Sequence, residues 1–277
     1  MRSESVEAMK GPRERLAATV FHLICAKSYE RPQDHDEEYF RERLAEAAAF
    51  FSRFGERFDL NGKTVLDVGC GYGSSCFYMA LNGAKRVVGV DTDEHRLAFA
   101  KAKLGSEYAS LGDAVEFRTA GAGDGDERFD VVLSQNSFQH YGDPEAVFER
   151  MTASLKPDGV MLIGFGPLWK SPYGGPIEFM TRLPWAHLMF PERVIMRERR
   201  RFRPDEEAET FSEIRGGMNK MTLRRFLGIV RDAGLRFERL RTNAGGGPRM
   251  RAFGALRWIP FLREYFTVNV YGIVRAG

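Results

Sequence analysis

The sequence is poor in the residues that build cross-linked or metal-bound scaffolds. Its 277 residues include only three cysteines and five histidines, and neither a CxxC nor an HExxH spacing occurs. We therefore expect no disulfide framework, zinc site or protein-bound catalytic metal, and the free cysteines fit a reducing, cytoplasmic compartment. No apolar run approaches the roughly 20 residues that cross a bilayer, and the short apolar stretch 17–26 is expected to be a helix.

An excess of charge of one sign is also missing. The chain carries 41 basic and 38 acidic residues, a formal charge of +3, which is too small to predict a protein that wraps nucleic acid. With 43% hydrophobic and 29% charged residues, the composition is typical of a folded protein with one large domain, or one domain plus a lid.

Apolar runs alternate with helical patterns through the middle of the chain. Five such runs predict strands, at 64–68, 86–90, 115–120, 129–133 and 160–165. Further signals predict a helix at 36–56, a turn at 156–159, a helix at 222–233, and strands at 235–240 and 266–274. The alternation predicts an α/β fold with a doubly wound, seven-stranded, mostly parallel sheet.

The same pattern divides the chain into four parts. Residues 1–60 are expected to form N-terminal helices that cover the active site, and residues 61–165 a Rossmann-like cofactor-binding core. Residues 166–221 contain six prolines and break the rhythm, so we expect an inserted lid that holds the acceptor. Residues 222–277 are expected to complete the core sheet.

A glycine-rich turn follows the first strand, at the edge of a parallel sheet where ligands bind. It reads Asp67-Val68-Gly69-Cys70-Gly71-Tyr72-Gly73, and no Lys or Arg lies between Asp67 and Lys85. The pattern is G-x-G-x-G, so it lacks the third glycine of the dinucleotide motif, and it also lacks the G-K-[ST] of a P-loop. A carboxylate at Asp67 would repel a diphosphate and attract a cationic ligand. Asp91, at the end of the second strand, suits a ribose.

The segments VLDVGCGYG and VVGVD resemble the first two motifs of the class I S-adenosylmethionine-dependent methyltransferases, and the resemblance covers about residues 60–165. It implies S-adenosyl-L-methionine as cofactor and S-adenosyl-L-homocysteine as product. The family pattern would place the methionine part of the cofactor along Gly69, Cys70 and Gly71, its amino group at Asp67 and its ribose at Asp91.

The resemblance also assigns Thr92, Gln135 and Asn136 to the cofactor site. One position departs from the family, where the third strand often ends in an Asp that contacts the adenine. Here that position is Gly121, so the adenine would depend on the backbone of Ala122.

The segment 134–140 resembles the family segment that borders the transferred methyl group. It contains no NPPY tetrapeptide, no Pro-Cys pair and no acid for a catechol-directing magnesium, which disfavours three subclasses of the family. His140 ends the segment, and a histidine can accept a proton near neutral pH. We consider two roles for it, a general base or a residue that pins the loop.

Residues 166–204 hold eight basic and three acidic residues as well as several aromatics. Trp169, Tyr173 and Trp185 could line an acceptor pocket or form a small core of the lid. His187 is expected to pack within the lid. The basic run 197–203 could face an anionic acceptor or a membrane surface, or it could be a solvated helix face.

The sequence therefore predicts a methyltransferase that modifies an oxygen, or else a nitrogen or carbon, of a small molecule, glycan or lipid-linked acceptor. Two alternatives are an NAD-dependent oxidoreductase of the same fold, which would lack the usual Tyr-x-x-x-Lys relay here, and a partner protein that binds the cofactor without catalysis. An RNA or protein acceptor could be held through the basic lid. The oligomeric state is not predicted.

Overall fold

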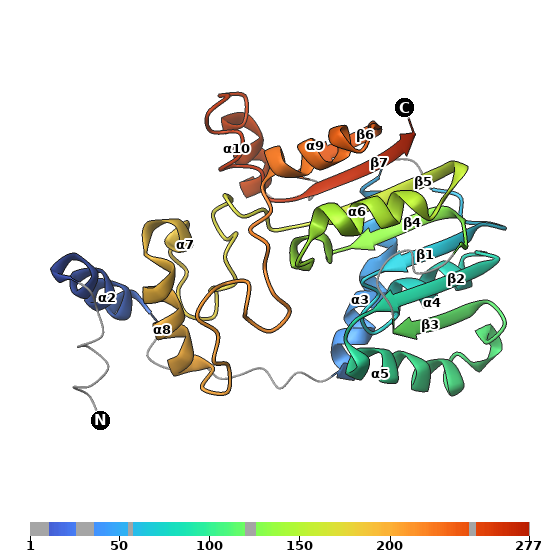
Figure 1. The fold of residues 1–277 in the computed structure, drawn as a ribbon, viewed down its shortest axis with the longest axis horizontal. Coiled ribbons are helices and arrows are strands. Elements are labelled where there is room, and N and C mark those ends of the chain that lie inside the picture. Colours follow the sequence, from blue (N-terminus) through green and yellow to red (C-terminus); the bar gives the residue numbers. More distant parts are fainter. Residues whose placement is uncertain (1–10, 26–35, 55–57, 120–125, 244–247, 277) are drawn as a thin grey trace.

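The structure is a computed structural model that describes residues 11–25, 36–54, 58–119, 126–243 and 248–276. In these residues seven strands form one sheet with the order β3-β2-β1-β4-β5-β7-β6 (Figure 1). The strands are β1 (Thr64–Val68), β2 (Arg86–Asp91), β3 (Val115–Thr119), β4 (Phe129–Gln135), β5 (Leu155–Phe165), β6 (Leu235–Thr242) and β7 (Val270–Ala276).

The first five strands are parallel, and β7 lies antiparallel between β5 and β6. Strands β1, β2 and β4 are buried along nearly their whole length because helices cover both faces of the sheet. The prediction of a doubly wound, mostly parallel sheet of seven strands is confirmed.

Adjacent residues of a strand point into opposite cores, as the period of two requires. Val65 and Val87 pack with three helices on one face, while Leu66 and Val88 pack with two helices on the other. The first face carries α3 (Asp36–Ser52), α4 (Ser74–Leu81) and α5 (Glu94–Gly105), and the second carries α6 (Pro144–Ala153) and α9 (Leu223–Asp232). A further helix, α10 (Pro248–Leu256), lies beside α9 in Figure 1.

Two predicted boundaries were wrong. Residues 156–159 belong to β5 and are not a separate turn, because Leu155 pairs with Phe129 and Val160 already pairs with Val131, so that the extra residues bulge within the strand. The last strand begins at Val270 and not at residue 266, since the preceding residues form hydrogen-bonded turns.

The segment 166–221 lies outside the sheet, between β5 and α9, and we call it the lid segment. It contains α7 (Ala186–Met189) and α8 (Glu192–Phe202) and has a hydrophobic core of its own. Helix α2 (Pro12–Ile24) packs against α8 and buries Phe21 there, as Figure 1 shows at the side away from the sheet. The two N-terminal helices thus have different partners, since α2 joins the lid segment and α3 joins the sheet.

Among the described residues, no helix is long and apolar enough to cross a membrane.

Candidate functional site

The glycine turn after β1 depends on backbone conformations that glycine adopts easily. Gly69, Gly71 and Gly73 have φ values of +76°, +54° and +80°. The turn is fixed by hydrogen bonds from the amides of Gly69 and Cys70 to the carbonyl of Val90, at 2.8 and 3.1 Å. A Cβ added at Gly69 would lie 2.5 Å from Ser137, whereas one at Gly71 would meet nothing nearer than 3.9 Å. Gly71 therefore leaves its space open to a ligand.

The segment after β4 holds the turn from the other side. The Ser137 hydroxyl donates to the carbonyl of Gly69 at 2.8 Å, and the Tyr141 hydroxyl donates to the carbonyl of Val68 at 2.8 Å. Burial raises the pKa of Tyr141 well above its ordinary value, so this phenol stays neutral and able to donate. The turn is rigid before any ligand arrives.

Asp67 is the most buried acid of the site, with 1% of its surface exposed. Its Oδ2 accepts a hydrogen bond from the thiol of Cys76 at 3.4 Å, and its Oδ1 has no partner. Burial raises the pKa of Asp67 to about 7, and the nearby charge of Asp91 adds to the rise. Burying a carboxylate oxygen without a hydrogen bond is unfavourable in free energy. A ligand that brings a hydrogen-bond donor or a positive charge to Oδ1 would remove this penalty.

Asp91 ends β2 beside the turn. Its Oδ2 accepts from the amide of Gly71 at 2.8 Å, and its Oδ1 accepts from the amide of Asp93 at 2.9 Å. These two bonds fix the carboxylate, and each oxygen keeps a free lone pair. The side chain is partly exposed, so it can accept two hydroxyl groups of a ligand.

A cavity of about 100 Å³ lies at this turn. Its lining brings together six residues that were predicted from the sequence: Asp67, Gly69, Cys70 and Gly71 at the turn, Gln135 at the end of β4, and Asn136 directly after it. The hydroxyl of Ser75 donates to Oε1 of Gln135, and Thr92 is exposed just beyond Asp91. Gly121 and Ala122 lie outside the described residues.

Arg43 of α3 also lines this cavity, and sequence reasoning missed it. Its Nε is buried without a hydrogen-bond partner, while its terminal nitrogen Nη1 pairs with Glu46 at 3.0 Å. Tyr39, one turn earlier, lines the same cavity, and its ring lies 5.2 Å from the Arg43 guanidinium. The four-residue spacing places both on one helix face, but nothing in the local sequence indicates that this face meets the glycine turn.

The first turn of α3 is bonded to the glycine turn at the cavity rim. The Tyr72 hydroxyl donates to Oδ1 of Asp36 at 2.6 Å, and Nε2 of His95 lies 2.8 Å from Oδ2 of the same carboxylate. The hydrogen bond from Tyr72 lowers the pKa of Asp36, and burial together with Asp36 raises the pKa of Tyr72 to about 12. Helix α3 therefore covers the turn through polar contacts.

His140 is exposed at the end of a short 3-10 helix, η2 (Phe138–His140). Its Nδ1 lies 2.8 Å from the carbonyl oxygen of Gly217 in the lid segment. A carbonyl only accepts, so Nδ1 carries the proton and Nε2 of the neutral ring has a free lone pair. This is the tautomer that a general base needs.

The end of the lid segment binds the same 3-10 helix through Asn219. The amide of Asn219 donates to the carbonyl of Gln139 at 2.9 Å, and its side-chain nitrogen donates to the carbonyls of Phe138 and Tyr141 at 2.8 and 3.0 Å. Together with the His140 contact, these bonds join the lid segment to the rim of the site.

The aromatic residues of the lid segment have protein partners. Trp169 packs on His187 and Phe211 at centroid distances of 4.8 and 5.0 Å, and the indole of Trp185 donates to the carbonyl of Lys170 at 3.1 Å. Tyr173 is half-buried nearby in sequence. An acceptor-lining role of Trp169, Tyr173 and Trp185 stays a prediction.

His187 is buried, and its Nε2 lies 2.6 Å from the carbonyl of Trp169. Burial lowers its pKa, which keeps the ring neutral in the packing role that the sequence predicted.

The basic run of α8 is largely neutralised within the lid segment. Arg199 is buried and pairs with Glu206 at 2.8 Å, Arg200 pairs with Glu209 at 3.6 Å, and Arg201 pairs with Glu198. Glu206 and Glu209 lie just after residues 166–204, the stretch in which basic residues outnumber acidic ones, so the excess of positive charge in that stretch is partly balanced by acids outside it. The expectation of a solvated helix face fits Arg200 and Arg201, which are exposed, whereas Arg199 is buried.

Comparison with known proteins agrees with the fold and the turn. Residues 66–163 match the family model described as "Methyltransferase domain". The chain is 40% identical over 115 residues to phosphoethanolamine N-methyltransferase 3 of Arabidopsis thaliana, and 37% identical over 115 residues to a ubiquinone biosynthesis O-methyltransferase of Bradyrhizobium diazoefficiens. Each match covers 40% of this chain, and 22% and 44% of those proteins respectively.

Among solved structures, an S-adenosylmethionine-dependent methyltransferase from Mesorhizobium loti is similar, with a TM-score of 0.54 and 18% identity over 83% of this chain and 97% of that chain. The likeness in fold covers more of the chain than residues 66–163. Residues 66–163 therefore match a methyltransferase domain, and the described chain has the fold of the similar S-adenosylmethionine-dependent methyltransferase.

Proposed function

We propose that the chain transfers a methyl group from S-adenosyl-L-methionine to an oxygen of a small-molecule, glycan or lipid-linked acceptor. One observation carries the cofactor part of the proposal: a buried Asp67 oxygen and a buried Arg43 Nε, both without partners, line one cavity at the glycine turn. Opposite charges that line one cavity complement a ligand with an ammonium and a carboxylate on one carbon, as in a methionine moiety.

The remaining contacts extend the same assignment. Asp67 would hold the amino group of the donor, Arg43 its carboxylate, and Asp91 the ribose hydroxyls. Gly69, Cys70 and Gly71 let the backbone approach the ligand closely. A buried carboxylate beside the turn disfavours a diphosphate, so the nicotinamide-dependent alternative has no support at this site.

The first test concerns the cofactor. Asp91→Ala removes a charged hydrogen-bond acceptor, which is worth about 1.5–3 kcal/mol, so the dissociation constant of S-adenosylhomocysteine should rise roughly tenfold to a hundredfold. Isothermal titration calorimetry measures it. The control is Asp113→Ala, which removes an exposed acid just before β3. If Asp91→Ala binds as tightly as the control, the ribose assignment is wrong.

The donor supplies a methyl group already activated by a positively charged sulfur, so the chain mainly aligns the reactants and excludes water. The acceptor hydroxyl must lose a proton as it attacks. His140 offers its Nε2 lone pair for that proton, because the carbonyl of Gly217 holds the proton on Nδ1. The relatives act on nitrogen in one case and oxygen in the other, and a base of this kind favours oxygen.

The second test concerns His140. His140→Ala should lower turnover by about 10²–10⁴-fold, the usual contribution of general-base catalysis, and should leave S-adenosylhomocysteine affinity unchanged. Turnover is measured with isotope-labelled donor, a metabolite extract and mass spectrometry, which also identifies the acceptor.

His22→Ala serves as the control, because His22 is half-exposed, contacts Glu198 of α8, and belongs to α2, which Figure 1 shows on the side away from the sheet. If His140→Ala turns over at nearly the wild-type rate, His140 is not the general base, and its role is to hold the loop in place. Tight cofactor binding by the wild-type chain with no turnover of any acceptor would favour the non-catalytic partner instead.

A further inference from the structure

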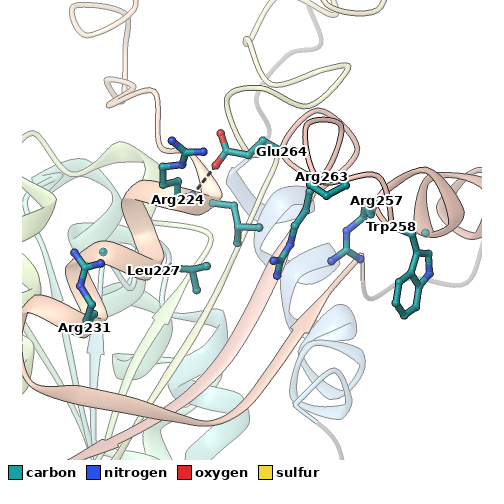
Figure 2. A pocket seen from close by; sticks show the side chains of 11 residues that line it. Arg224, Leu227, Arg231, Arg257, Trp258, Arg263 and Glu264 are labelled. Carbon is teal, nitrogen blue, oxygen red and sulfur yellow. Dashed lines mark hydrogen bonds between the residues drawn. The ribbon is translucent and has the colours of Figure 1, made fainter.

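A second hollow lies away from the cofactor cavity, between α9 and the residues around the end of α10. It has a volume of about 820 Å³, and we call it the α9 groove. Figure 2 shows Arg224 and Arg231 on the α9 side and Arg257 and Arg263 on the opposite side. Four arginines around one hollow are a strong concentration of positive charge.

The acids near the α9 groove leave most of this charge uncompensated. Asp232 pairs with Arg231 at 2.8 Å. Glu264 pairs with Lys170 at 2.6 Å and accepts from the backbone amide of Arg224 at 2.7 Å.

No described residue forms an ion pair with Arg224, Arg257 or Arg263. Partial burial, together with the charge of Arg263, lowers the pKa of Arg257, so the two guanidinium groups repel each other. An anion between them would relieve the repulsion, and guanidinium groups bind phosphate through paired hydrogen bonds.

Large apolar side chains are exposed directly beside these arginines. Trp258 has 88% of its surface exposed and Phe261 has 75%, and Leu256, Ile259 and Tyr265 are exposed as well. Single exposed apolar residues are ordinary, but five of them fall within residues 256–265, a segment that we call the patch, and Trp258 also lines the α9 groove. Aromatic and aliphatic tips mixed with arginines are the composition of a surface that enters the headgroup region of a bilayer.

The patch lies at the functional edge of the sheet. It precedes β7, whose first residue, Val270, pairs with Phe165 at the carboxyl end of β5. The glycine turn lies at the same edge, at the carboxyl end of β1. A surface that binds the segment 256–265 would therefore face the side of the molecule where ligands enter the sheet.

We propose that residues 256–265, with Arg224 of α9, form a docking surface for an anionic phospholipid bilayer. Trp258 and Phe261 insert among the headgroups, and Arg224 and Arg263 contact lipid phosphates, while the guanidinium of Arg257 is held by hydrogen bonds to Thr242 and Thr267. The chain has no membrane-spanning helix among its described residues, so this contact is peripheral and reversible.

The test is co-sedimentation of the full chain with vesicles. Vesicles of phosphatidylcholine mixed equally with phosphatidylglycerol should bind the chain, vesicles of phosphatidylcholine alone should bind it weakly, and added salt should release it. Arg224→Gln with Arg263→Gln should weaken binding about fivefold per arginine, since each basic residue near an anionic surface contributes about 1 kcal/mol. Trp258→Ser with Phe261→Ser should weaken binding further and remove the blue shift of tryptophan emission.

The matched control is Lys63→Gln with Lys85→Gln, which removes the same charge from exposed positions next to the amino ends of β1 and β2. If this control loses as much vesicle binding as the double arginine variant, net charge alone explains the binding and the docking surface is wrong. Failure of the wild-type chain to sediment with anionic vesicles would overturn it too, as would self-association that Phe261→Ser abolishes. Arg224, Arg263, Trp258 and Phe261 take no part in the proposed transfer, so S-adenosylhomocysteine binding should be unchanged in every variant and reports separately on the methyltransferase assignment.

Discussion

At the scale of the residue, Asp67 is the most buried acid of the cavity at the glycine turn. The carboxyl is fully enclosed, has one free oxygen, and has its pKa raised to about 7. A cationic ligand needs the ionised form, so binding must draw a proton off this group near neutral pH. The affinity for a ligand with an ammonium group is therefore coupled to pH.

S-Adenosylhomocysteine should bind about tenfold more tightly at a pH one unit above the pKa of Asp67 than at a pH one unit below it, because the ionised fraction changes by about that factor. Titration calorimetry across this range measures the change. Asp67→Asn should bind weakly and with little pH dependence. An equally steep dependence in Asp67→Asn would assign the titration to another group.

The stability of the unliganded chain changes in the opposite direction. The folded pKa of about 7 exceeds the ordinary value of 3.8, so the folded chain binds more protons than the unfolded chain between those values. The Asp67 contribution to the free energy of unfolding therefore falls as pH rises through this window and is fully lost above it.

Sequence reasoning found the residues of the site that lie in the two motifs, and it missed those that only the fold brings in. Asp67 and Asp91 stand at strand ends with a recognisable spacing, so a local pattern was enough. Arg43 stands on a helix whose periodicity indicated only a buried face. Its approach to the glycine turn depends on how α3 packs on α4, which no local signal encodes.

At the scale of the element, α8 shows how a charged helix can serve as core. Arg199 is 6% exposed, its Nε pairs with Glu206, and its Nη1 donates to the carbonyl of Pro176 at 2.7 Å. Its guanidinium also lies 5.0 Å from the ring of Phe179. One side chain thus connects three parts of the lid segment.

Arg199→Ala should destabilise the lid segment by about 3–5 kcal/mol, because it leaves the carboxylate of Glu206 buried without its partner. Trp169 and Trp185, both in this segment, report its unfolding through their fluorescence in a denaturant titration. Arg200→Ala is the matched control, since Arg200 is exposed and its pair is worth at most about 1 kcal/mol. Equal effects of the two changes would refute the structural role of Arg199.

The elements of the core were predictable because a buried parallel strand has a distinctive apolar run between turn signals. Strands β1 to β4 begin within one residue of the prediction. For the lid segment, the sequence predicted only that residues 166–221 interrupt the alternation of strands and helices. Its stability depends on pairs such as Arg199 and Glu206, whose partners are identified only once α8 and the following loop are folded together.

At the scale of the whole molecule, the sheet topology followed from the alternation of strands and helices, while the surface did not. The sequence pointed to 197–203 as the basic surface, and folding neutralises most of that run. Three arginines for which the described residues show no ion pair, Arg224, Arg257 and Arg263, line the α9 groove instead, although the first lies more than thirty positions from the other two in the chain. Pairing of charges is a property of the three-dimensional arrangement, and composition over a window does not report it.

The hydrogen bond from His140 to Gly217 makes the orientation and tautomer of the imidazole depend on a part of the chain that is distant in sequence. The imidazole presents its lone pair in a fixed direction only while the backbone at residue 217 stays in place, and Asn219 holds that backbone against η2. An acceptor that displaced this part of the lid segment would free the ring to rotate and exchange its proton. In the proposed transfer, proton abstraction by His140 would therefore depend on the contact between its ring and the lid segment.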